Sequence, residues 1–200
     1  ADVRAYALNA ASVALLEALK VWPALPAETR TAVHDMRIEG DAGALLRFSA
    51  WQQSVRELAW IVEAVALEAE LDAALRYAPH VAPVEGAVEA ALTVVAEGRA
   101  SATREALGVE FDEHDYGQDA IAARLLADTP HAGLARQWFR APDVLALLPL
   151  DRPQPGRGLA LVWSLPRERA KALLALDAAA FTAELMSATG AAAGQLELAG

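Results

Sequence analysis

The chain has 200 residues, of which 55% are hydrophobic, so it can bury a sizeable core in one large or two small domains. Its 27 acidic and 17 basic side chains give a formal net charge of -10, which repels polyanions and argues against nucleic acid as a partner. The absence of cysteine excludes disulfides, zinc–thiolate sites, iron–sulfur clusters and thiol catalysis. No apolar stretch reaches the length of a membrane span and no secretory signal begins the chain, so we expect a cytoplasmic location.

Helices and strands are both predicted in the first 77 residues. Asn9 is placed to cap a helix that ends before Pro23. Residues 33–39 alternate loosely enough to predict a strand, with a glycine-containing turn and a partner strand at residues 45–49 after it. Apolar residues at helical spacing, with no glycine or proline between them, predict a helix over residues 63–77.

The most informative segment follows, where an apolar run at residues 92–96 predicts a short strand that leads through Gly98 into a short helix. Glycine lets a bound group approach the backbone, a helix start offers unpaired N–H donors, and Arg99 and Arg104 add positive charge. This layout favours an anion, although such turns also occur in many proteins that bind no phosphate. Ser101 has the position of a helix cap rather than of a nucleophile.

The second half predicts a sheet followed by helices. Four apolar runs, separated by Pro, Gly and Asp, predict an antiparallel meander over residues 118–126, 134–139, 144–150 and 159–164. Pro166 then opens a helix, and Asp177 caps another that Gly190 stops. The order of elements predicts an α+β fold with an antiparallel or mixed sheet and flanking helices.

Two tryptophans and a histidine are candidates for a substrate pocket. Trp138 and Trp163 lie on predicted strands, where alternate residues face one side of a sheet, although large buried aromatic residues most often fill the core. His131 lies in a turn near that sheet and could contact a phenol, with a surface position as the alternative. No metal site is predicted, because the consecutive side chains of the acidic run at residues 112–115 point in different directions.

Short phrases along nearly the whole chain carry a resemblance to a known family. They occur at residues 2–12, 58–63, 97–101 with Arg104, 115–118, 130–131, 137–139 and 163–164. In this order they resemble the ubiquinone-biosynthesis hydroxylases of the flavin-dependent aromatic monooxygenase family. The resemblance implies an FAD enzyme, reduced by NAD(P)H, that hydroxylates a small aromatic substrate with or without a polyprenyl tail. It leaves membrane association open.

The resemblance also implies site residues. In that family the arginine matched by Arg4 lies against the flavin nucleotide, and the turn matched by Glu97 and Gly98 forms the dinucleotide side of the site together with Arg104. An arginine suits this position because it can pair in bidentate fashion with phosphate oxygens.

A domain division follows from the same resemblance. It assigns residues 1–32 and 60–110 to a partial FAD-binding domain and residues 33–59 and 111–189 to a substrate-binding domain. Residues 190–200, which carry no closing helix or strand signal, are expected to be a truncated tail.

The chain departs from the family pattern at several points. Glu97 stands where the family has aspartate, and Glu68 stands where relatives often have glutamine. No Gly-x-Gly-x-x-Gly turn precedes the matched phrases, and no Gly-Asp motif follows residue 186. We therefore expect the middle, substrate-side portion of a monooxygenase, inactive by itself. The alternative is a non-enzymatic binding or scaffold module that keeps the substrate-domain fold.

Overall fold

The computed structural model describes residues 2–86 and 88–199, which divide into two units. The larger unit comprises Ala1–Tyr77 and Gly117–Gly200, and the smaller unit comprises Ala78–Tyr116. The smaller unit has one short helix, α3 (Ala102–Ala106), within its described residues. Within the described ranges, no helix combines the length and the apolar character needed to cross a bilayer.

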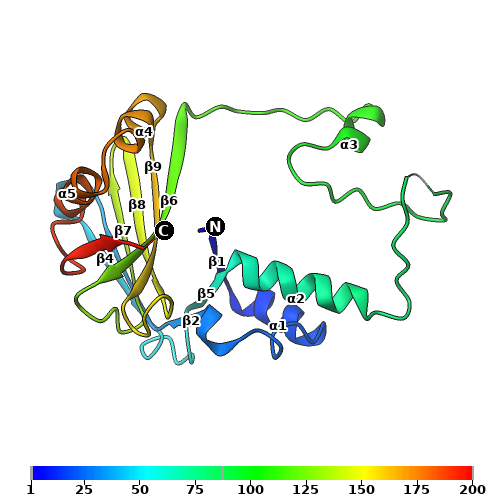
Figure 1. Ribbon diagram of the computed structural model, residues 1–200, viewed down its shortest axis with the longest axis horizontal. Helices are drawn as coiled ribbons and strands as arrows, with labels where there is room; N and C mark the ends of the chain where they lie inside the picture. The colour runs from blue at the N-terminus through cyan, green and yellow to red at the C-terminus, as the bar shows by residue number, and fades with distance from the viewer. Residues whose placement is uncertain (1, 87, 200) are drawn as a thin grey trace. The chain divides into compact units, whose positions relative to one another are not determined.

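Two sheets and four α-helices form the larger unit (Figure 1). The elements of its first part are β1 (Ala5–Leu8), α1 (Ala10–Ala18), η1 (Ala27–Thr29), β2 (Arg30–Val33), β3 (Asp35–Glu39), η2 (Asp41–Gly43), β4 (Leu45–Ser49), β5 (Ala59–Glu63) and α2 (Ala64–Arg76). Those of its second part are β6 (Gln118–Ala127), β7 (Leu134–Arg140), β8 (Asp143–Leu150), β9 (Gly158–Pro166), α4 (Arg167–Leu174), α5 (Ala178–Thr189) and β10 (Leu196–Leu198). The predicted α+β class is confirmed.

The smaller sheet has three strands in the order β1-β5-β2, all antiparallel, and packs against α1 and α2. The predicted cap of α1 is confirmed, because the Asn9 side chain accepts a hydrogen bond of 2.9 Å from the backbone N–H of Ser12. The predicted helix over residues 63–77 is confirmed as α2. An apolar core between helices and sheet includes Leu16, Trp22 and Val62.

The larger sheet has seven strands in the order β10-β6-β9-β8-β7-β3-β4. The four long predicted strands are confirmed as β6, β7, β8 and β9, but they do not form a simple meander. Strands β7, β8 and β9 pair in sequence order, but β6 pairs with β9 instead of with β7, which follows it in the chain. Strand β3 pairs with the other edge of this group, parallel to β7. The sheet is therefore mixed.

One face of the larger sheet carries the main core and is covered by α4 and α5 (Figure 1). The alternate residues Leu159, Leu161, Trp163 and Leu165 of β9 point to this face, as the twofold period of a strand requires. The predicted ends of α5 are confirmed. Asp177 caps its start, accepting 2.8 Å from the N–H of Ala180, and Gly190 ends it in a left-handed conformation with φ 58°.

The opposite face of the larger sheet is partly covered by the three-stranded sheet. Buried residues from both sheets form a third apolar cluster, made of Val33, Ala59, Ile61, Ala135, Leu150 and Ala160. This cluster joins the two sheets into one unit. The rest of this face of the larger sheet is not covered by the smaller sheet.

Three predictions about strands are wrong in part. Residues 33–39 do not form one strand, because the chain changes sheets at His34, whose backbone N–H donates to the carbonyl oxygen of Gly133 at 2.9 Å. Residues 92–96 form no strand. Beyond Gly190, where no closing strand was expected, Leu196–Leu198 forms β10 and pairs with β6.

Candidate functional site

The open part of the larger sheet is an apolar surface built from two rows of side chains in register. The first row crosses six strands through Leu46, Ile38, Gln137, Ala146, Val162 and Ala122. The second row crosses four strands through Phe139, Val144, Ser164 and Ala120. Leu46, Phe139 and Val162 are 60%, 44% and 37% exposed, so this surface is accessible. We call these ten residues the open face.

Polar groups on the open face are few: Gln137 lies within the first row, and Ser164 lies at one end beside Gln118. The Ser164 hydroxyl donates to Gln118 Oε1 at 2.9 Å, and Gln118 Nε2 donates to the carbonyl oxygen of Pro142 at 2.9 Å. A largely apolar surface with a small number of oriented polar groups is the usual composition of a small-molecule site. The open face can therefore receive a flat apolar group and orient a polar substituent at its Ser164 end.

Arg4 lies just before β1 and is held by acidic neighbours. Its guanidinium group donates to Asp2 at 2.6 Å, to Glu68 at 3.1 Å and to the hydroxyl of Tyr6 at 3.2 Å. The hydrogen bonds from Arg4 lower the pKa of Asp2 to about 2. Because Glu68 and Asp2 occupy its donors, an anion that approaches Arg4 competes with two carboxylates of this chain.

Arg124 is a second cation at the edge of the open face, and sequence reasoning did not single it out. It is half-buried on β6, on the same face as Ala122, and its Nη2 donates to the carbonyl oxygen of Arg4 at 2.9 Å. Its Nη1 is buried and has no hydrogen-bond partner among the described residues. Burial lowers the pKa of Arg124. The available signal was that Arg124 is the one basic residue in the sequence of β6, on the side of the strand that it shares with Ala120 and Ala122.

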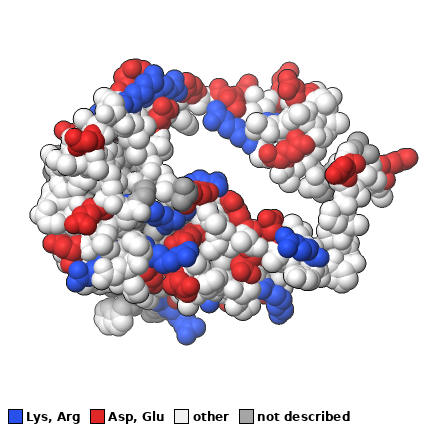
Figure 2. All heavy atoms as spheres, viewed as in Figure 1, with Lys and Arg blue, Asp and Glu red and all other residues white. Residues whose placement is uncertain are grey.

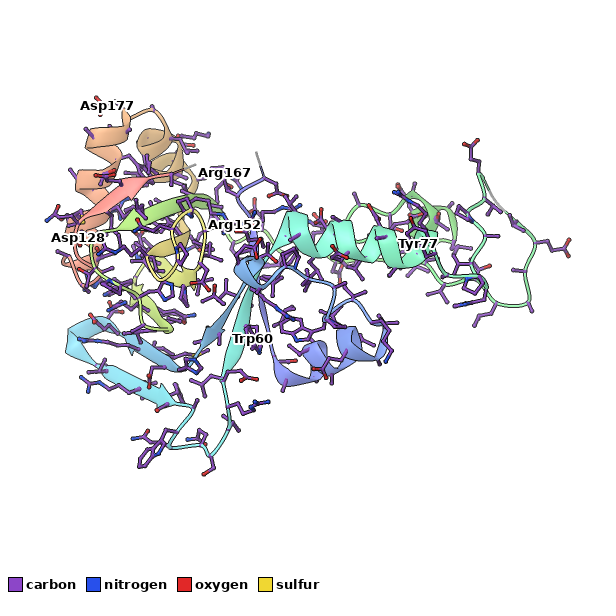
Figure 3. All side chains as sticks on the ribbon, turned by 60° about the horizontal axis from the view of Figure 1, so that its bottom comes forward. Trp60, Tyr77, Asp128, Arg152, Arg167 and Asp177 are labelled. Atoms are coloured by element: carbon purple, nitrogen blue, oxygen red, sulfur yellow. The ribbon has the colours of Figure 1, made fainter. Side chains whose placement is uncertain are left out.

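An ion pair at the junction of the two sheets lies close to these cations. Arg152, which follows β8 and is labelled in Figure 3, donates to both carboxylate oxygens of Glu63 at the end of β5. The hydrogen bond with Glu63 raises the pKa of Arg152. Arg152 is thus neutralised by the protein itself, whereas Arg124 keeps a donor without a partner.

In the smaller unit, the predicted anion site at the start of α3 is filled by a side chain of the protein. The Glu97 carboxylate accepts hydrogen bonds from the Ser101 hydroxyl at 2.7 Å, from the Thr103 N–H at 3.1 Å and from the Thr103 hydroxyl. These hydrogen bonds lower the pKa of Glu97. Ser101 accepts from the N–H of Arg104 at 3.1 Å, which confirms its role as the cap of α3.

Arg104 and Gly98 close the same turn from the other side. Arg104 donates to the carbonyl oxygens of Gly98 at 3.1 Å and Arg99 at 2.6 Å, and its guanidinium carbon lies 4.2 Å from the centre of the Phe111 ring. Gly98 has φ 82°, a conformation that favours glycine. The four residues predicted to contact a cofactor are thus divided between the units, with Arg4 in the larger unit and Glu97, Gly98 and Arg104 in the smaller one.

Trp138 and Trp163 lie on the face of the larger sheet that α4 and α5 cover, opposite the open face. Both pair in register with Leu145 and are almost fully buried. They line a cavity of about 270 Å³ with Asp143 and Arg169. A role in the core, which is the alternative to a pocket role, accounts for the burial of both rings. This cavity is where the two rings could contact a ligand.

His131 is buried, so the surface position considered from the sequence is wrong. Its Nδ1 accepts from the N–H of Gly133 at 3.0 Å, and its Nε2 therefore carries the proton and donates to the carbonyl oxygen of Leu150 at 3.0 Å. Burial lowers the pKa of His131. Both ring nitrogens serve the fold, and the structure does not bring His131 to the open face or to the two tryptophans.

Comparisons with known proteins show which proteins this chain resembles in sequence and in fold. No family model matches the chain. The ubiquinone hydroxylase UbiL of Rhodospirillum rubrum is 38% identical over 98 residues, which are 49% of this chain and 22% of that protein. The human mitochondrial ubiquinone biosynthesis monooxygenase COQ6 is 33% identical over 98 residues, which are 48% of this chain and 20% of that protein.

Solved structures agree with these sequence matches in their fold. PqsL, a probable FAD-dependent monooxygenase from Pseudomonas aeruginosa, superposes on the whole of this chain with a TM-score of 0.72 at 17% identity. The chain thus resembles ubiquinone hydroxylases in the sequence of about half its length, and it shares the fold of a probable FAD-dependent monooxygenase. HpxO of Klebsiella pneumoniae, solved with FAD and uric acid, superposes on 93% of the chain with a TM-score of 0.56 at 16% identity.

Coverage of these flavin-dependent monooxygenases is partial. The matched segment spans about a fifth of the two curated relatives, and the chain covers 64% of PqsL and 52% of HpxO. The likeness to the solved structures extends over both sheets of the chain, whereas the sequence matches extend over half of it.

Proposed function

We propose that this chain forms the substrate-side portion of an FAD-dependent monooxygenase that hydroxylates an aromatic ring in ubiquinone biosynthesis. The observation that carries the proposal is the open face, which is an accessible and largely apolar surface. Arg124 lies at its edge and donates a hydrogen bond to the carbonyl oxygen of Arg4. The similarity to UbiL and COQ6 supports the ubiquinone branch, since both are named for that pathway. We propose a cytoplasmic enzyme whose association with a membrane is open to test.

The proposed substrate is a small aromatic molecule that lies on the open face. The first row of this face crosses six strands, and since neighbouring strands lie about 4.8 Å apart, it extends for about 24 Å. An apolar strip of this length suits a polyprenyl tail, while the polar Ser164 end suits a phenolic hydroxyl. PqsL and HpxO are solved with 2-aminobenzoylacetate and uric acid, which are also small ring compounds.

A flavin fits the residues of this chain only in part, because carboxylates of the chain lie beside the donors that its phosphates would use. Arg4, Glu97, Gly98 and Arg104 remain the proposed contacts, and Arg124 adds a guanidinium N–H without a partner among the described residues. The carboxylates of Glu68 and Glu97 oppose a phosphate at these positions, because they already occupy the nearby donors. When bound, FAD would supply the redox chemistry with NAD(P)H and oxygen. The chain's own share is to bind the ring and to exclude water from it.

The partial fit underlies the second part of the proposal, which is that the 200-residue chain alone is inactive. The chain lacks a Gly-x-Gly-x-x-Gly turn, which cradles a pyrophosphate in dinucleotide-binding folds. Its own substrate-side surface is nevertheless complete enough to bind a ring. The pocket roles of Trp138, Trp163 and His131 stay predictions, and for the two tryptophans they are limited to the 270 Å³ cavity.

The test measures binding of a short-tailed 2-prenylphenol to the purified chain by isothermal titration calorimetry. Val162→Glu places a charge in the first row of the open face and should weaken binding at least tenfold. Val65→Glu, on the exposed side of α2, is the matched control and should leave binding unchanged. No binding by the wild type, or an equal loss in both variants, would contradict the proposal.

A parallel titration with FAD distinguishes two hypotheses: that the chain is an inactive portion of an enzyme, and that it is a flavoprotein by itself. We expect no stoichiometric FAD binding and no oxidation of NADPH by the chain alone. Tight binding with NADPH oxidation would overturn the proposed inactivity. A non-enzymatic module is the second candidate, favoured by the internal use of the Glu97 carboxylate at the start of α3, and it would bind neither FAD nor the phenol.

A further inference from the structure

Three arginines stand in register across neighbouring strands of the larger sheet. Arg37 on β3 pairs directly with Arg47 on β4 and with Arg136 on β7. Because directly paired residues point to the same side, the three side chains share one face, the same face as Trp138 and opposite the open face. Like charges directly opposite each other destabilise a sheet, so this arrangement costs folding stability. We call these three residues the arginine row.

Acidic residues neutralise the arginine row only in part. Glu39 pairs with Arg37 at 3.0 Å, but it is shared with Arg140 at 3.6 Å. Asp35 lies on the same face of β3 and has no side-chain hydrogen bond or ion pair within residues 2–86 and 88–199. Four arginines therefore face two carboxylates in this part of the sheet, in a chain whose net charge is -10.

The two outer members of the row have unused donors. Within the part of the chain that the structure describes, neither Arg47 nor Arg136 makes a side-chain hydrogen bond or an ion pair with an acidic residue. Arg136 is half-buried, and burial together with the nearby charge of Arg37 lowers its pKa. A half-buried guanidinium without a partner is costly, because its lost hydration is not replaced. Figure 2 shows Asp and Glu side chains spread over the visible face of the molecule, in keeping with its net charge of -10.

A concave space lies beside the row. A cavity of about 560 Å³ is lined by all three arginines and also by the polar side chains of Ser49 and Gln52. Its volume is in the range of small-molecule sites. The hydroxyl and the amide can donate further hydrogen bonds to an acceptor that the guanidinium groups hold.

We propose that the arginine row binds a phosphate-bearing anion. A phosphate monoester carries about -1.5 to -2 charges at pH 7 and three acceptor oxygens, so one group can compensate both Arg47 and Arg136. The planar guanidinium group pairs with phosphate oxygens in bidentate fashion. The row spans about 10 Å, which also admits two linked phosphate groups. A single carboxylate would leave one of the two outer arginines without compensation.

The phosphate could belong to a soluble compound or to a lipid headgroup, and the first experiment distinguishes them. Inorganic pyrophosphate is titrated into the full chain at low ionic strength, and sedimentation is measured with vesicles of phosphatidylcholine alone and of equal parts phosphatidylcholine and phosphatidylglycerol. A soluble ligand predicts binding of pyrophosphate without vesicle binding. A lipid ligand predicts sedimentation with the phosphatidylglycerol vesicles only. Binding to neither probe would overturn the proposal.

Variants then test the site itself. Arg136→Gln and Arg37→Gln should each weaken binding of the successful probe at least tenfold, whereas Arg76→Gln, at the exposed end of α2, should change it less than twofold. Equal losses in all three variants would reduce the effect to net charge and contradict the site. The melting temperature without anion supplies a second readout. Arg136→Gln removes a like-charge contact, so this temperature should not fall, while the rise caused by the anion should disappear.

Discussion

His131 and Leu150 are joined by a hydrogen bond of 3.0 Å between the imidazole Nε2 and the backbone carbonyl oxygen, inside the larger unit. Since the N–H of Gly133 donates to the other ring nitrogen, the buried imidazole is neutral. Asp151 lies 3.9 Å away and favours the charged form, but burial outweighs it and lowers the pKa of His131. The fold therefore depends on a histidine that must stay unprotonated.

A pH dependence of stability follows from this lowered pKa. The unfolded chain binds a proton at this histidine near its ordinary pKa of 6.5, whereas the folded chain binds it only at lower pH. The stabilisation is therefore present above pH 6.5, and the free energy of unfolding should fall as the pH drops from 6.5 through the folded pKa. Urea unfolding of the wild type and of His131→Ala between pH 5 and 8 measures this difference.

The variant His131→Ala should be less stable at pH 8 by about 1–3 kcal/mol, because it leaves the N–H of Gly133 and the carbonyl oxygen of Leu150 without partners. Between pH 6.5 and 5 its stability should change less than that of the wild type. His80 is exposed, so His80→Gln should keep the wild-type pH profile. A wild-type profile in His131→Ala would show that another group controls the acid response.

Gly158, at the start of β9, is predicted to tolerate no side chain. An added Cβ would lie 2.1 Å from the carbonyl oxygen of Arg152 and 2.8 Å from that of Leu150, and neither backbone atom can move without disturbing β8 or the turn after it. Gly158→Ala should lower the free energy of unfolding by at least about 3 kcal/mol. Gly40→Ala is the control, because its Cβ would meet only Ala44 at 3.4 Å, and it should cost less than about 1 kcal/mol. Chemical denaturation of both variants measures the two free energies of unfolding, and equal losses would contradict the prediction.

The Asp177 cap of α5 should be worth about 1 kcal/mol, measured as the loss of unfolding free energy in Asp177→Ala. The carboxylate accepts from the N–H of Ala180 at 2.8 Å at the exposed start of the helix (Figure 3). Asp177→Asn keeps an acceptor oxygen at the same position and should lose only a few tenths of a kcal/mol. If the two variants lost the same stability, the hydrogen bond would not be the source of the effect.

Local signals in the sequence were sufficient for much of the fold. Asn9, Asp177 and Gly190 act through hydrogen bonds and backbone angles within a few residues, so the ends of α1 and α5 could be predicted. The break at His34 could not, because it depends on a hydrogen bond to Gly133, about a hundred residues away. The short strands β1, β5 and β10 are likewise defined by distant partners.

The site was harder to predict than the fold for the same reason. Alternation along β7 and β9 shows that Trp138 and Trp163 share a face, but only the packing of α4 and α5 decides which face is buried. The arginine row exists only through the register of three strands, of which β3 and β7 lie far apart in the sequence. Arg124 can be recognised as a residue at the edge of the open face only when it is known which part of the larger sheet the smaller sheet covers.

Trp163 distinguishes a core role from a binding role in a last prediction. Its ring is 1% exposed, its Nε1 donates to Asp143 at 3.2 Å, and its ring centre lies 6.4 Å from that of Phe181 on α5. Trp163→Ala should therefore lower the free energy of unfolding by about 3–5 kcal/mol, whereas Trp51→Ala, at an 86% exposed position, should change it by less than about 0.5 kcal/mol. Trp163→Phe keeps most of the apolar contact and should recover more than half of the loss. A stable Trp163→Ala variant with weakened phenol binding would instead assign the ring to the ligand, through the cavity it shares with Trp138.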